Sequence, residues 1–185
     1  MSYIATTDDL FFNRTDLDQK RLENIVNNAL TGADDGELYL EYRQSEGMVF
    51  DDGRLKNASF DTSQGFGLRA IAGDSAGYAH ASDLSEEAIK RAVNTVQAVH
   101  SGHSGTMAGS PQGTNSALYT EDNPLSACAF ETKIKVLSDI DAYARAKDPR
   151  VVQVSASISG EWQAGQITRA DAHKVADIRT LVRLN

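Results

Sequence analysis

Gly65, Gly67 and Arg69 are the residues of this sequence whose types and spacing first suggest a binding site. The Gly-Phe-Gly triplet could form half of a dinucleotide-binding fingerprint, in which a helix following a strand binds the pyrophosphate at its N-terminus. However, the triplet lies inside the alternating segment GFGLRAIA, and the chain has no G-x-x-x-x-G-K-[ST] motif. We therefore expect a strand bulge, or a place where another backbone comes close, at these glycines.

Arg69 follows the two glycines on the same predicted strand. Its guanidinium could reach across these small neighbours to a carboxylate. An ion pair with a carboxylate of the neighbouring strand is the plainer interpretation, and we favour it because charged side chains usually stay at the surface.

The histidines and the single cysteine are the other candidates for chemistry. His100 and His103 have a spacing that could chelate a metal on a helix, but Gly102 predicts that the helix has ended. His80 and His173 lie elsewhere in the sequence, whereas a zinc site needs three or four ligands. Cys128 has no partner base in the sequence and is typical of a small buried apolar residue. These residues predict no catalytic constellation.

The elements that must position these residues follow from the hydrophobic pattern. Apolar residues recur with helical spacing in 15–30, 88–99 and 125–147. Alternation predicts strands at 37–44, 54–60, 65–72, 76–81, 151–163 and 175–184, and the segment 48–55 carries a hairpin signal. The segment 101–124 is rich in Gly, Ser, Thr and Asn and is predicted to be a loop.

Short turns between the predicted strands indicate antiparallel pairing, because parallel strands need long crossovers. Asp52-Gly53 predicts a tight hairpin, Gly73-Asp74 predicts another, and Thr15 and Ser85 are expected to cap helices. The predicted fold class is α+β, with a mainly antiparallel sheet, a β-meander, and helices packed on one face.

The charge balance limits the partners of the chain. Its 185 residues carry a formal net charge of −8, so nucleic acid and anionic membrane surfaces are not expected partners. A lone cysteine allows no internal disulfide, and no signal peptide or membrane-spanning run is predicted, which favours a cytoplasmic protein. The strand-like segment VADIRTLVRLN stops at Asn185 without a turn or cap, so we expect a truncated chain.

Several blocks of the sequence follow one another in a distinctive order. The main block is SEGMVFDDGRLKNASFDTSQGFGLRAIAGDSAGYAHASDLS, and the later blocks are LYTEDNP, AKDPRVVQVSASISG and VADIRTLVRLN. In this order they resemble the TldD/PmbA family, and its TldD branch more than its PmbA branch. Together they extend from about Glu37 to Asn185. The resemblance implies that residues 1–185 form the N-terminal domain of a TldD-like protein, with the C-terminal catalytic domain absent.

The resemblance also implies a metallopeptidase function for the family. TldD-like proteins are cytoplasmic metallopeptidases that pair with a PmbA-type subunit or self-associate and cut unfolded peptides. Their metal, zinc or another transition metal, is held by an H-E-x-x-x-H motif in the C-terminal half, and this motif does not occur here. No catalytic, cofactor or metal residue is therefore carried over to this chain, and the chain alone is expected to be inactive.

The role that the resemblance implies for this domain is to contribute to the substrate cleft and the subunit interface. Gly65, Gly67 and Arg69 are the positions expected to lie near substrate or interface. The alternative is a stand-alone peptide-binding or regulatory module that kept the fold and lost the catalytic half.

Overall fold

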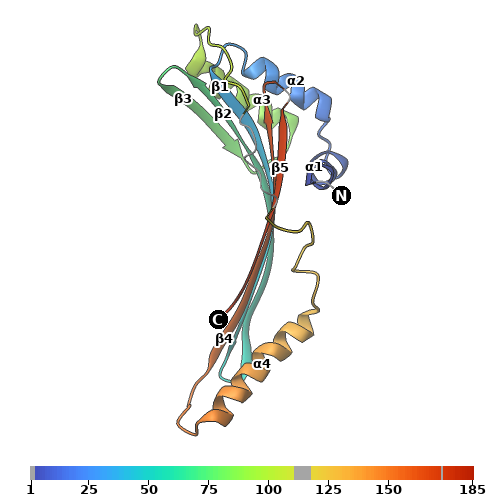
Figure 1. The fold of residues 1–185 in the computed structure, drawn as a ribbon, viewed down its shortest axis with the longest axis vertical. Helices are drawn as coiled ribbons and strands as arrows, with labels where there is room; N and C mark the ends of the chain where they lie inside the picture. The colour runs from blue at the N-terminus through green and yellow to red at the C-terminus, as the bar shows by residue number, and fades with distance from the viewer. Residues whose placement is uncertain (1–2, 111–117, 172) are drawn as a thin grey trace. The chain divides into compact units, whose positions relative to one another are not determined.

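The structure is a computed structural model that describes residues 3–110, 118–171 and 173–185. The helices in these ranges are α1 (Tyr3–Asp8), the π-helical turn η1 (Asp9–Asn13), α2 (Gln19–Ala29), α3 (Glu86–His100) and α4 (Phe130–Lys147). The strands are β1 (Asp35–Asp51), β2 (Arg54–Ala72), β3 (Ser75–Ala81), β4 (Ser155–Arg169) and β5 (Lys174–Leu184) (Figure 1). No helix in the described ranges is long and apolar enough to cross a membrane.

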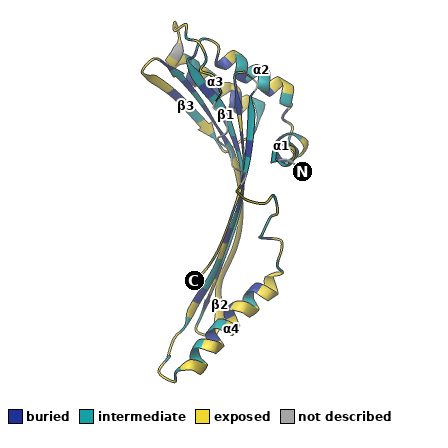
Figure 2. Cartoon of the chain, viewed as in Figure 1, coloured by how far each residue is buried: buried dark blue, intermediate teal, exposed yellow. Residues whose placement is uncertain are grey.

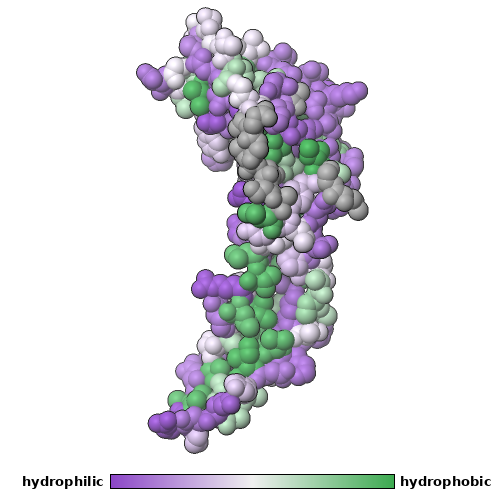
Figure 3. Space-filling model, in the orientation of Figure 1, coloured by the Kyte–Doolittle hydropathy of each residue, from purple (hydrophilic) through white to green (hydrophobic). Residues whose placement is uncertain are grey.

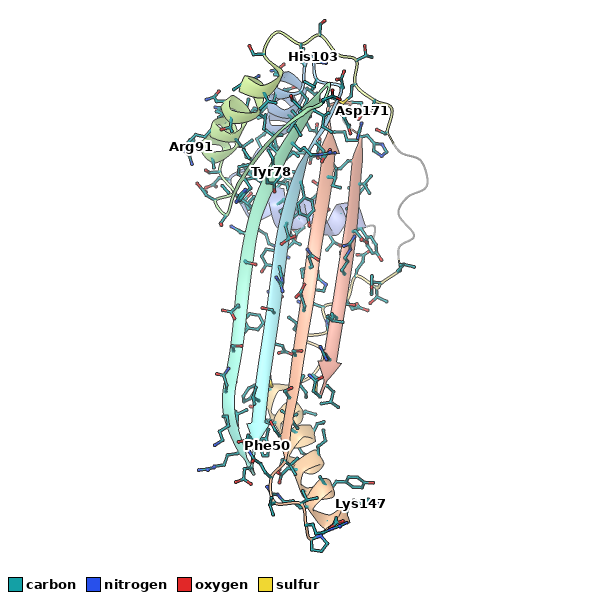
Figure 4. All side chains as sticks on the ribbon, turned by 90° about the vertical axis from the view of Figure 1, so that its left-hand side faces the viewer. Phe50, Tyr78, Arg91, His103, Lys147 and Asp171 are labelled. Atoms are coloured by element: carbon teal, nitrogen blue, oxygen red, sulfur yellow. The ribbon has the colours of Figure 1, made fainter. Side chains whose placement is uncertain are left out.

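The strands form one five-stranded sheet in the order β3-β2-β1-β4-β5, and neighbouring strands run in opposite directions (Figure 4). The Asp52-Gly53 hairpin is confirmed, because both residues have positive φ, 49° and 76°. A two-residue turn of this kind matches the twist of the strands that it joins. Gly73, with φ of 57°, turns the chain from β2 into β3, which pairs Ala72 with Ser75. The predicted α+β fold is therefore correct.

The chain divides into two compact units, and four of the strands contribute to both. Unit 1 comprises 1–42, 63–121 and 164–178, and unit 2 comprises 43–62, 122–163 and 179–185. Figure 2 shows buried residues recurring along the strands and on one side of the helices. The alternation has a simple cause, since successive side chains of a strand point to opposite faces of the sheet.

In unit 1 the helices α2 and α3 cover the sheet face that carries the even-numbered residues of β1 and β2 and the odd-numbered residues of β3. The buried core there includes Leu22, Val26, Leu38, Leu40, Leu68, Ala70, Ile89 and Val96. At Gly77 of β3, an added Cβ would lie 3.2 Å from the Cα of Val96, so α3 rests directly on this strand. The opposite face of β1, β2 and β3 carries none of these core residues.

In unit 2 the helix α4 covers the strands. Met48, Phe50, Leu137 and Ala156 form its buried cluster, with Ile134, Ile140 and Ile158 packed against it. Figure 4 shows Phe50 beside α4, and Figure 3 shows apolar residues gathered over the part that carries α4. The stretch of β2 from 54 to 62 is exposed throughout, including Phe60 at 60%.

Several predicted boundaries are wrong, for local reasons. The helix expected to begin after Thr15 begins at Gln19, because Asp18 accepts from the backbone N–H of Arg21 while the Thr15 hydroxyl donates to the carbonyl of Phe11. Strand β1 extends beyond the predicted strand 37–44 to Asp51, where the hairpin begins, and β2 joins the two strands predicted at 54–60 and 65–72. Ser85 caps α3 as expected, by accepting from the N–H of Ala88.

The predicted loop 101–124 contains no helix or strand in its described parts, 101–110 and 118–124. Residues 111–117 lie outside the described residues. Helix α4 begins at Phe130, five residues later than the helical pattern predicted, and its N-terminal residue Ala129 makes no side-chain cap.

Candidate functional site

A pocket of about 270 Å³ opens on the opposite face of the unit 1 sheet, which carries the odd-numbered residues of β1 and β2 and the even-numbered residues of β3. Gly65 and Gly67 of β2 form its floor, because they are the small residues between the two side walls. The side chains around them are Tyr39 and Glu41 of β1, and Tyr78 and His80 of β3. The β2–β3 register pairs Gly67 with His80 and Arg69 with Tyr78, which places these residues on one face of the sheet.

Both floor glycines have close neighbours, and at Gly65 the neighbour is backbone that leaves no room for a side chain. A Cβ at Gly65 would lie 2.7 Å from the carbonyl oxygen of Ala81, and a Cβ at Gly67 would lie 2.7 Å from the Tyr78 hydroxyl oxygen. Real Cβ atoms do not approach backbone this closely, so Gly65 is a site of close backbone approach, as expected from the sequence. Neither glycine precedes a helix, so they do not form a phosphate-binding loop.

Two tyrosines that line this pocket lie close to glycines. The Tyr78 ring lies over Gly67, and the Tyr39 ring lies over Gly165 of β4, where an added Cβ would be 2.9 Å from Cε2 of the ring. Tyr39 donates its hydroxyl to Oε2 of Glu41 at 2.7 Å. The rings of Tyr78 and His80 are 5.6 Å apart between centroids. The result is an aromatic pocket with one carboxylate.

Arg69 forms the cross-strand ion pair that we favoured. Its Nε and Nη2 donate to the two carboxylate oxygens of Glu37 at 2.6 and 2.7 Å, and Asp35 lies 3.6 Å away. The hydrogen bond to Glu37 is the main cause that raises the pKa of Arg69. Since this fork is already filled by Glu37, Arg69 does not offer a free guanidinium to a ligand. Whether Gly65, Gly67 and Arg69 contact substrate stays a prediction.

The sequence missed the aromatic and acidic members of the pocket, Tyr39, Glu41, Tyr78 and His80. Their signal was present in the alternation, because Tyr39 and Glu41 share one face of β1 and Tyr78 and His80 share one face of β3. Only the pairing of the strands brings them together, since Tyr39 and Tyr78 are far apart in the sequence.

The second pocket lies in unit 2 and has a volume of about 330 Å³. Lys133 of α4 and Glu46 of β1 form its polar part, with Phe60, Cys128 and Phe130 among its apolar residues. Lys133 Nζ donates to Glu46 Oε1 at 2.6 Å and to the Leu125 carbonyl at 2.7 Å. Because both groups of this ion pair are buried, with side chains 9% and 10% exposed, we assign it a structural role.

The described residues do not contain a metal centre. No three His, Cys, Asp or Glu side chains gather among them, and the side chain of His100 lies outside the described residues. His103 instead pairs with Asp34, with Nε2 2.9 Å from Oδ2. The pKa of Asp34 is lowered, mainly because the backbone N–H of Gly73 donates to its carboxylate.

We predict that the purified chain holds no stoichiometric metal, because a closed zinc site needs four ligands and a catalytic one three. Elemental analysis after purification without chelators measures this. A zinc or iron content near one atom per chain, retained through dialysis, would contradict the prediction.

The arrangement in the described residues favours binding over covalent chemistry. No serine or cysteine there donates to a histidine, so no activated nucleophile of the kind used in acyl transfer is in place. The pocket of unit 1 has instead the features of a binding site, which are a concave shape, aromatic walls and one charged group.

Comparisons with known proteins agree on one family. Residues 36–100 match a family described as PmbA/TldA metallopeptidase domain 1. The chain is 35% identical over 156 residues to a metalloprotease TldD homolog of Haemophilus influenzae, and 26% identical over 156 residues to one of Buchnera aphidicola. Each match covers 82% of this chain and 32% of the relative, so the chain spans about a third of the length of the curated relatives it matches.

Solved structures share the fold. A modulator of DNA gyrase from Bacteroides thetaiotaomicron has a TM-score of 0.68 at 15% identity, over 92% of this chain and 41% of that chain. TldE from Thermococcus kodakarensis has a TM-score of 0.62 at 14% identity, over 89% and 37%. At these identities the likeness concerns the fold of the matched region.

Proposed function

The chain belongs to the TldD/PmbA family, whose first domain it carries, and from this we propose that it is the non-catalytic N-terminal domain of a metal-dependent peptidase acting on unfolded peptides. The observation that carries the proposal is the 35% identity to a metalloprotease TldD homolog over 82% of the chain, which spans only 32% of that relative. The remaining length of such a protein is where the catalytic residues are proposed to lie.

The residues of this chain do not fit the catalytic metal. The sequence has no H-E-x-x-x-H motif, and the described residues contain no cluster of three ligands. Zinc or another transition metal is therefore proposed to be held by the C-terminal domain of the full-length protein. This chain contributes the pocket of unit 1 and exposed strand edges, which are suited to a peptide that adds as a strand.

The proposed partners are an unfolded peptide substrate and either a PmbA-type subunit or a second copy of the chain. The proposed location is the cytoplasm. The exposed stretch 54–62 of β2 in unit 2 supports an interface role, because unpaired backbone groups on an edge strand can pair with another chain. The subunit interface and the substrate cleft are the two surfaces that this proposal assigns to the domain.

A stand-alone peptide-binding or regulatory module is the second candidate. It is favoured by one observation, which is that the unit 1 pocket is built from residues 39–82 alone and needs no other domain.

Intact mass of the protein from its native source separates the two candidates. Because the chain covers 32% of the curated relatives, we expect a species roughly three times heavier than the 20.0 kDa of this chain. Mass spectrometry of protein captured with an antibody against residues 1–185 makes the measurement. A dominant species near 20.0 kDa would instead support the stand-alone module.

A further inference from the structure

We propose that the pocket between β1, β2 and β3 of unit 1 binds the basic side chain of a peptide, that of a lysine or an arginine. The proposal rests on the proposed function only for the peptide nature of the ligand. The cationic chemistry is argued from the pocket itself.

The size of the pocket suits one side chain. Its volume is about 270 Å³, whereas pockets for whole drug-sized ligands range from about 300 to 1,000 Å³. Gly65 and Gly67 contribute no side chains to this space, which leaves it to the side chains around them.

The charge of the pocket selects a cation. Glu41 is the only carboxylate among the residues that line it, and no lysine or arginine lines it. The Tyr39 hydroxyl donates to Oε2 of Glu41, which holds the carboxylate at the wall of the pocket. An ammonium or guanidinium group makes charge-assisted hydrogen bonds with a carboxylate, whereas a phosphate or carboxylate ligand would be repelled.

The aromatic walls add to the attraction for a cation. Ammonium and guanidinium groups bind over tyrosine faces, and arginine also stacks on them. Tyr78 remains 62% exposed although its ring rests on Gly67, so one edge is held while most of the side chain is open to a ligand. Tyr39 is held in the same way over Gly165. Rings that are already positioned lose little conformational freedom when the ligand binds.

The test is a titration of the full 185-residue chain, labelled with ¹⁵N, with capped single amino acids. Nα-acetyl-lysine methylamide and its arginine counterpart are the cationic probes, and the norleucine and glutamate counterparts are the apolar and anionic controls. We expect saturable shifts at the amides of Gly65, Gly67 and His80 with the cationic probes, at affinities at least fivefold above norleucine. Equal affinity for norleucine, preference for glutamate, or no saturable shift at these amides would overturn the proposal.

Variants locate the binding in the pocket. Glu41→Gln keeps an acceptor for the Tyr39 hydroxyl but removes the negative charge. We expect it to lower the affinity for the lysine probe roughly tenfold, the effect of one hydrogen bond to a charged group. Tyr78→Leu is expected to lower the affinity for the arginine probe more than the affinity for the norleucine probe. Glu87→Gln, an exposed residue of α3, changes the net charge equally and is the matched control. If Glu87→Gln lowers the affinity for the lysine probe as much as Glu41→Gln does, the cause is the net charge of the chain and the pocket proposal fails.

This experiment is independent of peptidase activity. Binding of the cationic probes without any peptide cleavage by the full-length protein would support the pocket and reject the proposed function. Cleavage with no probe binding would reject the pocket and leave the proposed function standing. A dispersed ¹⁵N spectrum of each variant establishes that it is folded.

Discussion

The 185-residue chain alone is expected to leave an unfolded peptide intact, whereas the full-length protein is expected to cleave it. Amide hydrolysis at useful rates needs an activated nucleophile and stabilisation of the oxyanion. Among the described residues, no serine or cysteine is paired with a histidine and no three metal ligands gather. We therefore expect measurable cleavage by the full-length protein and no detectable cleavage by the chain alone.

The measurement compares cleavage of one unfolded peptide by this chain, by the full-length protein, and by the full-length protein with a PmbA-type partner. Mass spectrometry of the products detects cuts at low yield. A full-length variant with both histidines of an H-E-x-x-x-H motif replaced is the matched control for contaminating peptidases. Cleavage by the chain alone that survives chelation and a further purification step would mean that an active site lies within these 185 residues.

Replacing Lys133 with alanine is expected to destabilise unit 2 by about 3–5 kcal/mol, the usual effect of removing one partner of a buried ion pair. The change leaves the Glu46 carboxylate, 10% exposed, without its ammonium, and it leaves the Leu125 carbonyl without its donor. A buried charge without a partner is the source of the large effect. Lys135→Ala on the same helix removes an exposed pair with Asp139 and is expected to change stability by only about 0.3–0.5 kcal/mol.

Urea unfolding measures both variants through the fluorescence of Trp162, the single tryptophan, which is buried in unit 2. The double variant Lys133→Met, Glu46→Leu is expected to recover most of the loss, because apolar residues of similar size can replace a buried ion pair without penalty. A Lys133→Ala variant within about 1 kcal/mol of the parent chain, less than removal of a buried partner costs, would show that the pair is solvated in solution.

Local features were determined by the sequence alone. The Asp52-Gly53 hairpin and the Ser85 cap need only residues within three positions of one another, so their physics is complete in a short segment. The α+β class followed from the periods of the pattern, which depend on backbone geometry and not on partners. The missing H-E-x-x-x-H motif is likewise a property of the sequence itself.

Features that depend on partners distant in the sequence were decided only by the tertiary structure. Arg69 could be predicted to have a carboxylate partner, but Glu37 lies 32 residues away and is chosen by the pairing of β1 with β2. A lysine on a helix is normally expected to be exposed. Lys133 is buried because Glu46, which lies 87 residues away in the sequence, pairs with it. The unit 1 pocket is of the same kind. Alternation tells which face of its own strand Tyr39 or Tyr78 occupies, but only the register of neighbouring strands brings the two tyrosines to one pocket.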